Sequence, residues 1–188
     1  TDSIVVIPNG VTAIGERAFD YCATMTSVVI PNSVTSIGPY AFQESGLTSV
    51  TIPDSVTTLG EGAFSQCKAL ATVVIGSGVT EIWDQTFVSC EKLTNVTMSD
   101  RVTTLGYRAF GLCSSLSNFE MPSSILYIGK EAFASDPLTS FYLPDTVLFI
   151  GKNVCTSTLI DEVRLPNPPP DAKLSNGQSI SAANIQAI

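Results

Sequence analysis

The cysteines are the residues whose type and spacing first suggest chemistry. The chain has five of them, and Cys22, Cys67, Cys90 and Cys113 each lie three residues after a phenylalanine. Cysteine sulfur can bind a metal ion or form disulfides. A metal site favours close Cys-x-x-Cys pairs, and the sequence contains none. We therefore expect no metal and no cofactor, and we favour reduced, buried thiols over a disulfide between Cys67 and Cys90.

Enzymatic chemistry finds little support in the remaining residues. Histidine is absent, which removes the commonest general base and excludes Ser-His and Cys-His nucleophiles. The glycines form neither a dinucleotide fingerprint nor a phosphate-binding loop. The neighbouring carboxylates Asp161 and Glu162 would point to opposite faces of a strand. We predict that the protein is not an enzyme.

Composition limits the class of protein and its partners. The chain has 188 residues, of which 44% are hydrophobic, enough for one continuous core. A net charge of -8 disfavours nucleic acid and anionic membranes as partners. No apolar run is long enough for a membrane span, and the first residues lack a signal-peptide pattern. Because Ile4 and Ile7 already belong to a repeat, we expect a mature protein or an excised piece.

An internal repeat organises the chain. Its most regular element is Ala-Phe, which becomes Thr86-Phe87 in the fourth unit and Val154-Cys155 near the end. Successive phenylalanines lie 22 or 23 residues apart, at Phe19, Phe42, Phe64, Phe87, Phe110 and Phe133. A period of this length, with Leu, Val and Ile at fixed offsets, predicts a leucine-rich solenoid.

Each repeat contains two extended segments. The motif Leu-x-x-Val-x-Ile-Pro predicts a short strand that proline ends. We expect these strands, stacked in parallel, at 4–7, 27–30, 49–52, 72–75, 95–98, 118–121, 140–143 and 162–165. The motif Val-x-x-Ile/Leu-Gly predicts a second extended segment closed by a glycine turn. After the glycine we expect a short helical turn that points Ala and Phe inward, in a right-handed superhelix.

The unit LTSVTIPDSVTTLGEGAFSQC, residues 47–67, resembles the BspA-type leucine-rich repeat. The resemblance covers about residues 4–165 and implies surface or secreted proteins that recognise host or microbial macromolecules without catalysis. It transfers no binding residue, because the shared positions are those of the core. The prolines at 168–170 resemble the start of a C-terminal cap, although no further strand is evident after them. We predict a solenoid of about seven repeats over 1–166 and a cap or linker over 167–188.

Candidate binding residues are those that depart from the repeat at outward positions. Along one outward column of the strands, small residues give way to Glu120, Tyr142 and Arg164. This mixture of charge and an aromatic ring is typical of binding anchors. Trp83 occupies a glycine position in the fourth repeat, where we expect a local bend and a half-buried ring. These four residues are our candidate ligand-binding residues.

A second departure creates an apolar patch. The outward pairs of the second segment are small or polar in five repeats and then become Leu126 with Tyr127, and Leu148 with Phe149. Soluble monomers rarely leave such a patch bare. The first candidate to cover it is the tail, which carries Leu174, Ile180, Ile185 and Ile188. A following domain or a second copy of the chain is the alternative.

These observations favour a non-catalytic binding module. We expect adhesion or recognition at a cell surface or outside the cell, with a protein or glycan partner and a monomer or weak oligomer in solution. One alternative is a passive spacer within a larger surface protein. Another is an intracellular interaction scaffold, which unpaired thiols would permit.

Overall fold

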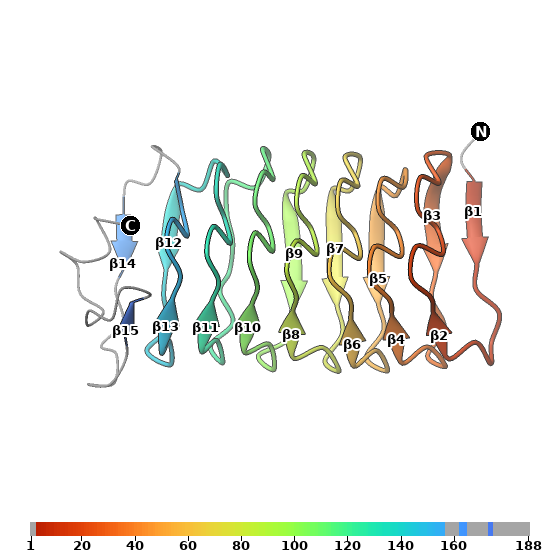
Figure 1. The fold of residues 1–188 in the computed structure, drawn as a ribbon, viewed down its shortest axis with the longest axis horizontal. Coiled ribbons are helices and arrows are strands. Elements are labelled where there is room, and N and C mark those ends of the chain that lie inside the picture. The colour runs from red at the N-terminus through yellow and green to blue at the C-terminus, as the bar shows by residue number, and fades with distance from the viewer. Residues whose placement is uncertain (1–2, 157–161, 165–172, 175–188) are drawn as a thin grey trace.

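The chain folds as a row of stacked coils. The computed structural model describes residues 3–156, 162–164 and 173–174. Figure 1 shows the N-terminal coil at one end of the row and the last strands at the other, with two series of strands running along it. Every paired strand is parallel to its neighbour, so each coil satisfies backbone groups of the next coil.

The first row is built from the Leu-x-x-Val-x-Ile motif. In β5 the buried Val50 and Ile52 alternate with the exposed Ser49 and Thr51, as the pattern predicts. The row divides into three sheets, β1-β3, β5-β7-β9 and β12-β14. Its strands are β1 (Ser3–Val6), β3 (Met25–Val29), β5 (Ser49–Ile52), β7 (Thr72–Ile75), β9 (Asn95–Met98), β12 (Ser140–Tyr142) and β14 (Glu162–Arg164).

The expected strand at 118–121 is wrong. These residues carry the motif but form no strand, and the first row is interrupted between β9 and β12. Phe119 stands where several other repeats have valine, and its ring packs 5.0 Å from that of Phe110 and 4.6 Å from that of Phe133, centroid to centroid. The size of the ring does not explain the missing strand, because Phe141 occupies the same position in β12.

The second row consists of two-residue strands before each turn. It forms two sheets, β2-β4-β6 and β8-β10-β11-β13-β15. Its strands are β2 (Ala13–Ile14), β4 (Ser36–Ile37), β6 (Thr58–Leu59), β8 (Glu81–Ile82), β10 (Thr104–Leu105), β11 (Tyr127–Ile128), β13 (Phe149–Ile150) and β15 (Lys173–Leu174). Strand β15 corrects the expectation that no strand follows the prolines. It pairs in register with Phe149 and Ile150 and is too short for a pattern to reveal.

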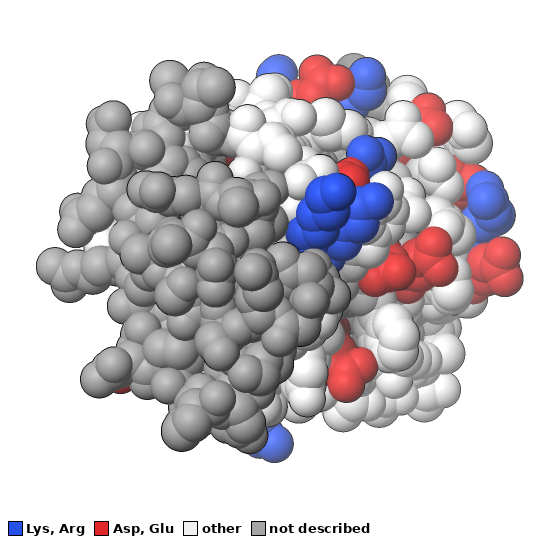
Figure 2. Space-filling view, turned by 60° about the vertical axis from the view of Figure 1, so that its left-hand side comes forward, with Lys and Arg blue, Asp and Glu red and all other residues white. Residues whose placement is uncertain are grey.

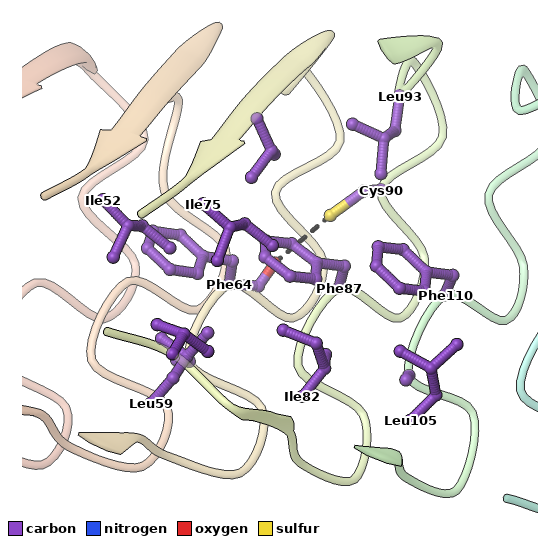
Figure 3. Packing of buried hydrophobic residues seen from close by; sticks show 14 of the residues in the cluster. Ile52, Leu59, Phe64, Ile75, Ile82, Phe87, Cys90, Leu93, Leu105 and Phe110 are labelled. Carbon is purple, nitrogen blue, oxygen red and sulfur yellow. Dashed lines mark hydrogen bonds between the residues drawn. The ribbon is translucent and has the colours of Figure 1, made fainter. Parts of the chain in front are cut away.

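The core contains a ladder of stacked phenylalanine rings. From Phe19 to Phe133, successive rings lie 5.1, 5.1, 5.5, 5.3 and 5.6 Å apart and within 9° of parallel. Figure 3 shows part of this ladder between the aliphatic side chains of the two strand rows. Five of the six rings are fully buried, and Phe19 in the first coil is partly buried. The repeat spacing therefore appears in space as one continuous column.

The expected helical turns are absent from the described residues. Two positions in most turns, such as Arg17 and Tyr21, have positive φ, which a right-handed helix does not allow. Alternate N–H groups instead donate to the next coil, as Phe19 does to the Ala41 carbonyl at 2.7 Å. The spacing of hydrophobic residues correctly predicted that Ala and Phe point inward. It could not predict the backbone conformation of the turn, because several conformations place the same residues inward.

The cysteine column is buried and carries no disulfide. Cys67, Cys90 and Cys113 are unpaired, and each Sγ donates to a phenylalanine carbonyl of the preceding coil at 3.0, 3.3 and 3.2 Å. One of these bonds, from Cys90 to Phe64, is drawn in Figure 3. Burial raises the pKa of Cys67 to about 11. This geometry agrees with the expected buried thiols.

Candidate binding surfaces

Two of the predicted ligand-binding residues meet in one depression. Glu120 and Tyr142 lie on adjacent coils, and both line a hollow of about 530 Å³ on the first-row face. Glu120 is exposed, and 43% of the surface of Tyr142 is accessible. The floor and rim include Phe119, Met121 and Pro144. The hollow thus offers an aromatic ring, a carboxylate and apolar surface together, a combination suited to binding rather than to catalysis.

The backbone places Arg164 beside this hollow. Strand β14 pairs with β12, and Tyr142 is in direct register with Arg164. The side chain of Arg164 lies outside the described residues. The register places Tyr142 and Arg164 on adjacent coils, and the hollow joins Glu120 to Tyr142.

Several lining residues escaped the sequence analysis. Asp145 and Ser123 border the hollow together with Met121 and Pro144. They belong to the segment after each strand, where the repeat shows ordinary turn residues. They lie near Glu120 and Tyr142 only because two coils are stacked. Their place at the hollow can be recognised only when the alignment of the neighbouring coils is known.

Trp83 lies outside that hollow, on the second-row side of the fourth coil. Half of its surface, 50%, is exposed. The second row is interrupted between β6 and β8, the strands on either side of this coil boundary. The Trp83 ring is therefore half-exposed at the place where the second row of strands is interrupted.

The four residues of the predicted apolar patch are in contact through adjacent strands. Tyr127 is in register with Phe149, and their rings are 6.4 Å apart. The N–H of Leu148 donates to the carbonyl of Leu126 at 2.8 Å. Tyr127 is 47% exposed, and the other three are partly exposed. Strand β15 extends the same row, while Ile180, Ile185 and Ile188 lie outside the described residues.

Two further surface features had no strong sequence signal. A hollow of about 590 Å³ lies over the early strands, with Val29, Thr51 and Val74 on its surface. At the turn edge, Glu131 forms ion pairs with Arg108 at 2.6 Å and with Lys130 at 3.2 Å. These two cations hold the pKa of Glu131 below its usual value.

On the face in Figure 2, charge is spread rather than concentrated. The largest group of basic atoms lies near the centre of the view, other basic atoms and the acidic atoms are scattered, and most of the described surface is uncharged. Within the described part of the chain, no group of histidine, cysteine and carboxylate side chains is placed to hold a metal ion. No helix there has the length and apolar character that a membrane crossing requires.

The stacked coils, with two rows of short parallel strands and one phenylalanine per turn, define a leucine-rich repeat solenoid. The family model of the BspA type leucine rich repeat region matches residues 3–90 and 70–171, with six copies. The chain belongs to the BspA-type leucine-rich repeat family. Such repeats are generally non-enzymatic scaffolds that bind other proteins.

Solved structures of bacterial proteins share the fold. A leucine-rich repeat protein of Bacteroides ovatus is 24% identical with a TM-score of 0.71, over 95% of this chain and 54% of that one. A T. pallidum leucine-rich repeat protein is 24% identical with a TM-score of 0.65, over 88% and 71%. A leucine-rich cell surface protein of Faecalibacterium prausnitzii is 24% identical with a TM-score of 0.50, over 95% and 63%.

The chain therefore spans only about half the length of the Bacteroides ovatus protein. Among curated proteins, none matches the chain significantly.

Proposed function

We propose that this chain is a recognition module that binds a protein or glycan at a cell surface or outside the cell. The observation that carries the proposal is the hollow shared by Glu120 and Tyr142. In the preceding coils the same column carries Val29, Thr51 and Thr97. The large polar and aromatic side chains therefore begin where the hollow lies.

The chemistry of the hollow suits an extended macromolecule. Tyrosine supplies a rigid, amphipathic contact surface, and residues of this type are enriched among binding hot spots. Glu120 adds an exposed acceptor, while Phe119 and Met121 provide apolar surface beneath. The hollow is shallow and lies on a rigid stack of strands, so it resembles a docking surface rather than an enclosed small-molecule site.

The cell-surface location rests on the family and on similarity. The protein from Faecalibacterium prausnitzii is described as a cell surface protein, and the fold is shared with it. Protease treatment of intact cells tests this part of the proposal. Cleavage of the protein in intact cells with an intact cytoplasmic marker supports it, and protection until lysis contradicts it.

The binding experiment uses an array of extracellular-matrix proteins and glycans. The test variant combines Glu120→Ala, Tyr142→Ala and Arg164→Ala. The matched control combines Thr51→Ala, Val74→Ala and Thr97→Ala, which alter the same outward column over β5, β7 and β9. We expect the wild type and the control to bind a common set of ligands and the test variant to lose them. Binding that survives in the test variant would move the site elsewhere.

A further inference from the structure

The second row is broken at one coil boundary, and Trp83 marks the place. In the other coils the glycine after each strand donates its N–H to the preceding coil, as Gly60 does to Ile37 at 2.8 Å and Gly106 to Ile82 at 2.7 Å. Within residues 3–156, the N–H of Trp83 makes no such bond. The first row continues undisturbed through β5, β7 and β9. The interruption is therefore local to the Trp83 side of the coil.

Crowding explains the interruption. A Cβ atom added at Gly60 would lie 2.5 Å from the backbone nitrogen of Pro39, and one at Gly106 would lie 2.6 Å from that of Asp84. This column has no room for a side chain, so we attribute the lost pairing of β6 with β8 to the tryptophan, while the turn that follows keeps its bonds between the coils, as Gly62 N–H to the Asp84 carbonyl at 3.0 Å shows. The departure sacrifices backbone hydrogen bonds, each worth about 1 kcal/mol. Local violations of a repeat that cost stability are expected at functional positions.

A second departure in the same coil supports the first. Thr86, which replaces the inward alanine of the repeat, is fully buried. Its hydroxyl donates to the Trp83 carbonyl at 2.8 Å. The backbone that carries the exposed ring is thus fixed from inside the core. A preorganised ring loses little conformational entropy when a partner binds.

Three exposed carboxylates belong to the same two coils as Trp83. Glu81 precedes it by two residues and departs from the repeat, since the same position is Thr58 in β6 and Thr104 in β10. Asp84 follows Trp83 and accepts a hydrogen bond from the N–H of Tyr107, and Glu61 in the third coil accepts one from the Tyr40 hydroxyl. Among the described residues, none of these three carboxylates forms an ion pair with Lys or Arg. A half-exposed tryptophan on coils that carry negative charge without a paired cation has the composition that favours a cation.

We propose that Trp83, with Glu81 beside it, is a docking point for the lysine or arginine side chains of a basic peptide segment in a protein partner. Tryptophan is the best aromatic partner of a cation, and the carboxylates add attraction that salt screens. The inference rests on the proposed binding function but concerns a separate surface from the Glu120 and Tyr142 hollow. Each surface can therefore fail without the other.

The test measures the fluorescence anisotropy of a fluorescein-labelled octa-arginine peptide. A labelled octa-glutamate peptide, which carries the opposite charge, is the control. Trp83 is the one tryptophan of the sequence, so its emission reports this surface directly. We expect octa-arginine to bind and to change the tryptophan emission. Trp83→Gly, which restores the repeat, should weaken binding about tenfold and raise the melting temperature. Higher stability would separate lost binding from misfolding.

Two charge variants provide the matched comparison. Glu81→Gln and Glu16→Gln remove the same charge from different places, and Glu16 is exposed in the first coil, away from both candidate surfaces. We expect Glu81→Gln to weaken octa-arginine binding several-fold and Glu16→Gln to leave it unchanged. Equal effects of the two variants, or full binding by Trp83→Gly, would show attraction to the overall negative charge and overturn the proposal. Absence of octa-arginine binding by the wild type would overturn it as well.

Discussion

The backbone N–H of Cys113 donates a 2.7 Å hydrogen bond to Oδ1 of Asp136 in the next coil. Asp136 occupies the cysteine column and is 1% exposed, and its Oδ2 has no hydrogen-bond partner among the residues that the structure describes. Burial raises the pKa of this carboxyl from 3.8 to about 8, despite the bond from Cys113. The solenoid therefore contains a buried acid that is protonated at neutral pH.

This acid makes stability depend on pH. Between pH 4 and pH 8 the unfolded state ionises Asp136 while the folded state keeps its proton, so stability falls as pH rises through this window. We expect Asp136→Ser, which copies Ser45 in the same column, to be more stable than the wild type at pH 8 by a few kcal/mol, on the order that the shift implies. Urea unfolding of both proteins at several pH values measures the difference. A difference that stays constant with pH would contradict the buried-acid account.

For Asp54 we predict the opposite dependence of stability on pH, at lower pH values. Its Oδ1 accepts hydrogen bonds from the N–H of Ser77 at 2.6 Å and from the Ser77 hydroxyl at 3.0 Å, and these bonds lower its pKa. The ionised Asp54 therefore stabilises the fold at pH values above its pKa in the unfolded state. This stabilisation is lost as the pH falls through its lower pKa in the folded state. We expect Asp54→Ala to unfold more easily at pH 7 and to differ less from the wild type at pH 2. An equal difference at both values would show that the carboxylate charge is not involved.

Removing a ring from the middle of the phenylalanine ladder should lower the stability of the fold strongly. Phe87 is fully buried and stacks on Phe64 and Phe110. Phe87→Ala should cost about 3–5 kcal/mol, because the cavity separates coils that stabilise each other. Phe19→Ala is the control, since Phe19 stacks only on Phe42 and is partly exposed. Chemical denaturation should show the smaller loss for Phe19→Ala, and equal losses would contradict coupling along the ladder.

The thiols should react in an order set by burial. Cys67, Cys90 and Cys113 are fully buried, and burial raises the pKa of Cys155 to about 12. At pH 8 we expect Cys22, which is partly exposed, to react first with a thiol reagent and the other four to react only on unfolding. Fewer than five thiols in the unfolded protein, prepared without reductant, would contradict the expected reduced state. Rapid reaction of the native Cys90 would contradict the packed column.

The repeat predicted the positions of the core well, because the same side chains face inward in every coil. Val50, Ile52 and Phe64 are buried as their spacing required. The helical turns were wrong because the period fixes which residues face inward but not the sign of φ at Arg17 or Tyr21. The strand at 118–121 was wrong although these residues carry the same motif as β12, where Phe141 stands at the position of Phe119.

The same limits apply to the candidate surfaces. The repeat step, 22 residues between Glu120 and Tyr142, predicted that the two would lie on adjacent coils, and the structure brings them into one hollow. The interruption of the second row at Trp83 agrees with a side chain at a glycine position, because the crowding there is a local effect. Asp145 and Met121 could not be predicted, because the alignment of neighbouring turns depends on packing between coils rather than on a repeat.

The apolar patch of Leu126, Tyr127, Leu148 and Phe149 gives the last prediction. Strand β15 pairs with β13 at Phe149, so this part of the tail lies at the edge of the patch. We expect deletion of residues 167–188 to lower the melting temperature and to promote self-association, because the deletion removes β15 and leaves apolar surface uncovered. Analytical ultracentrifugation measures the association. In the truncated chain, Leu126→Thr with Leu148→Thr restores the threonine of Thr103 in the same column and should return the protein to a monomer. A truncated chain that is monomeric and equally stable would show that the tail does not cover the patch.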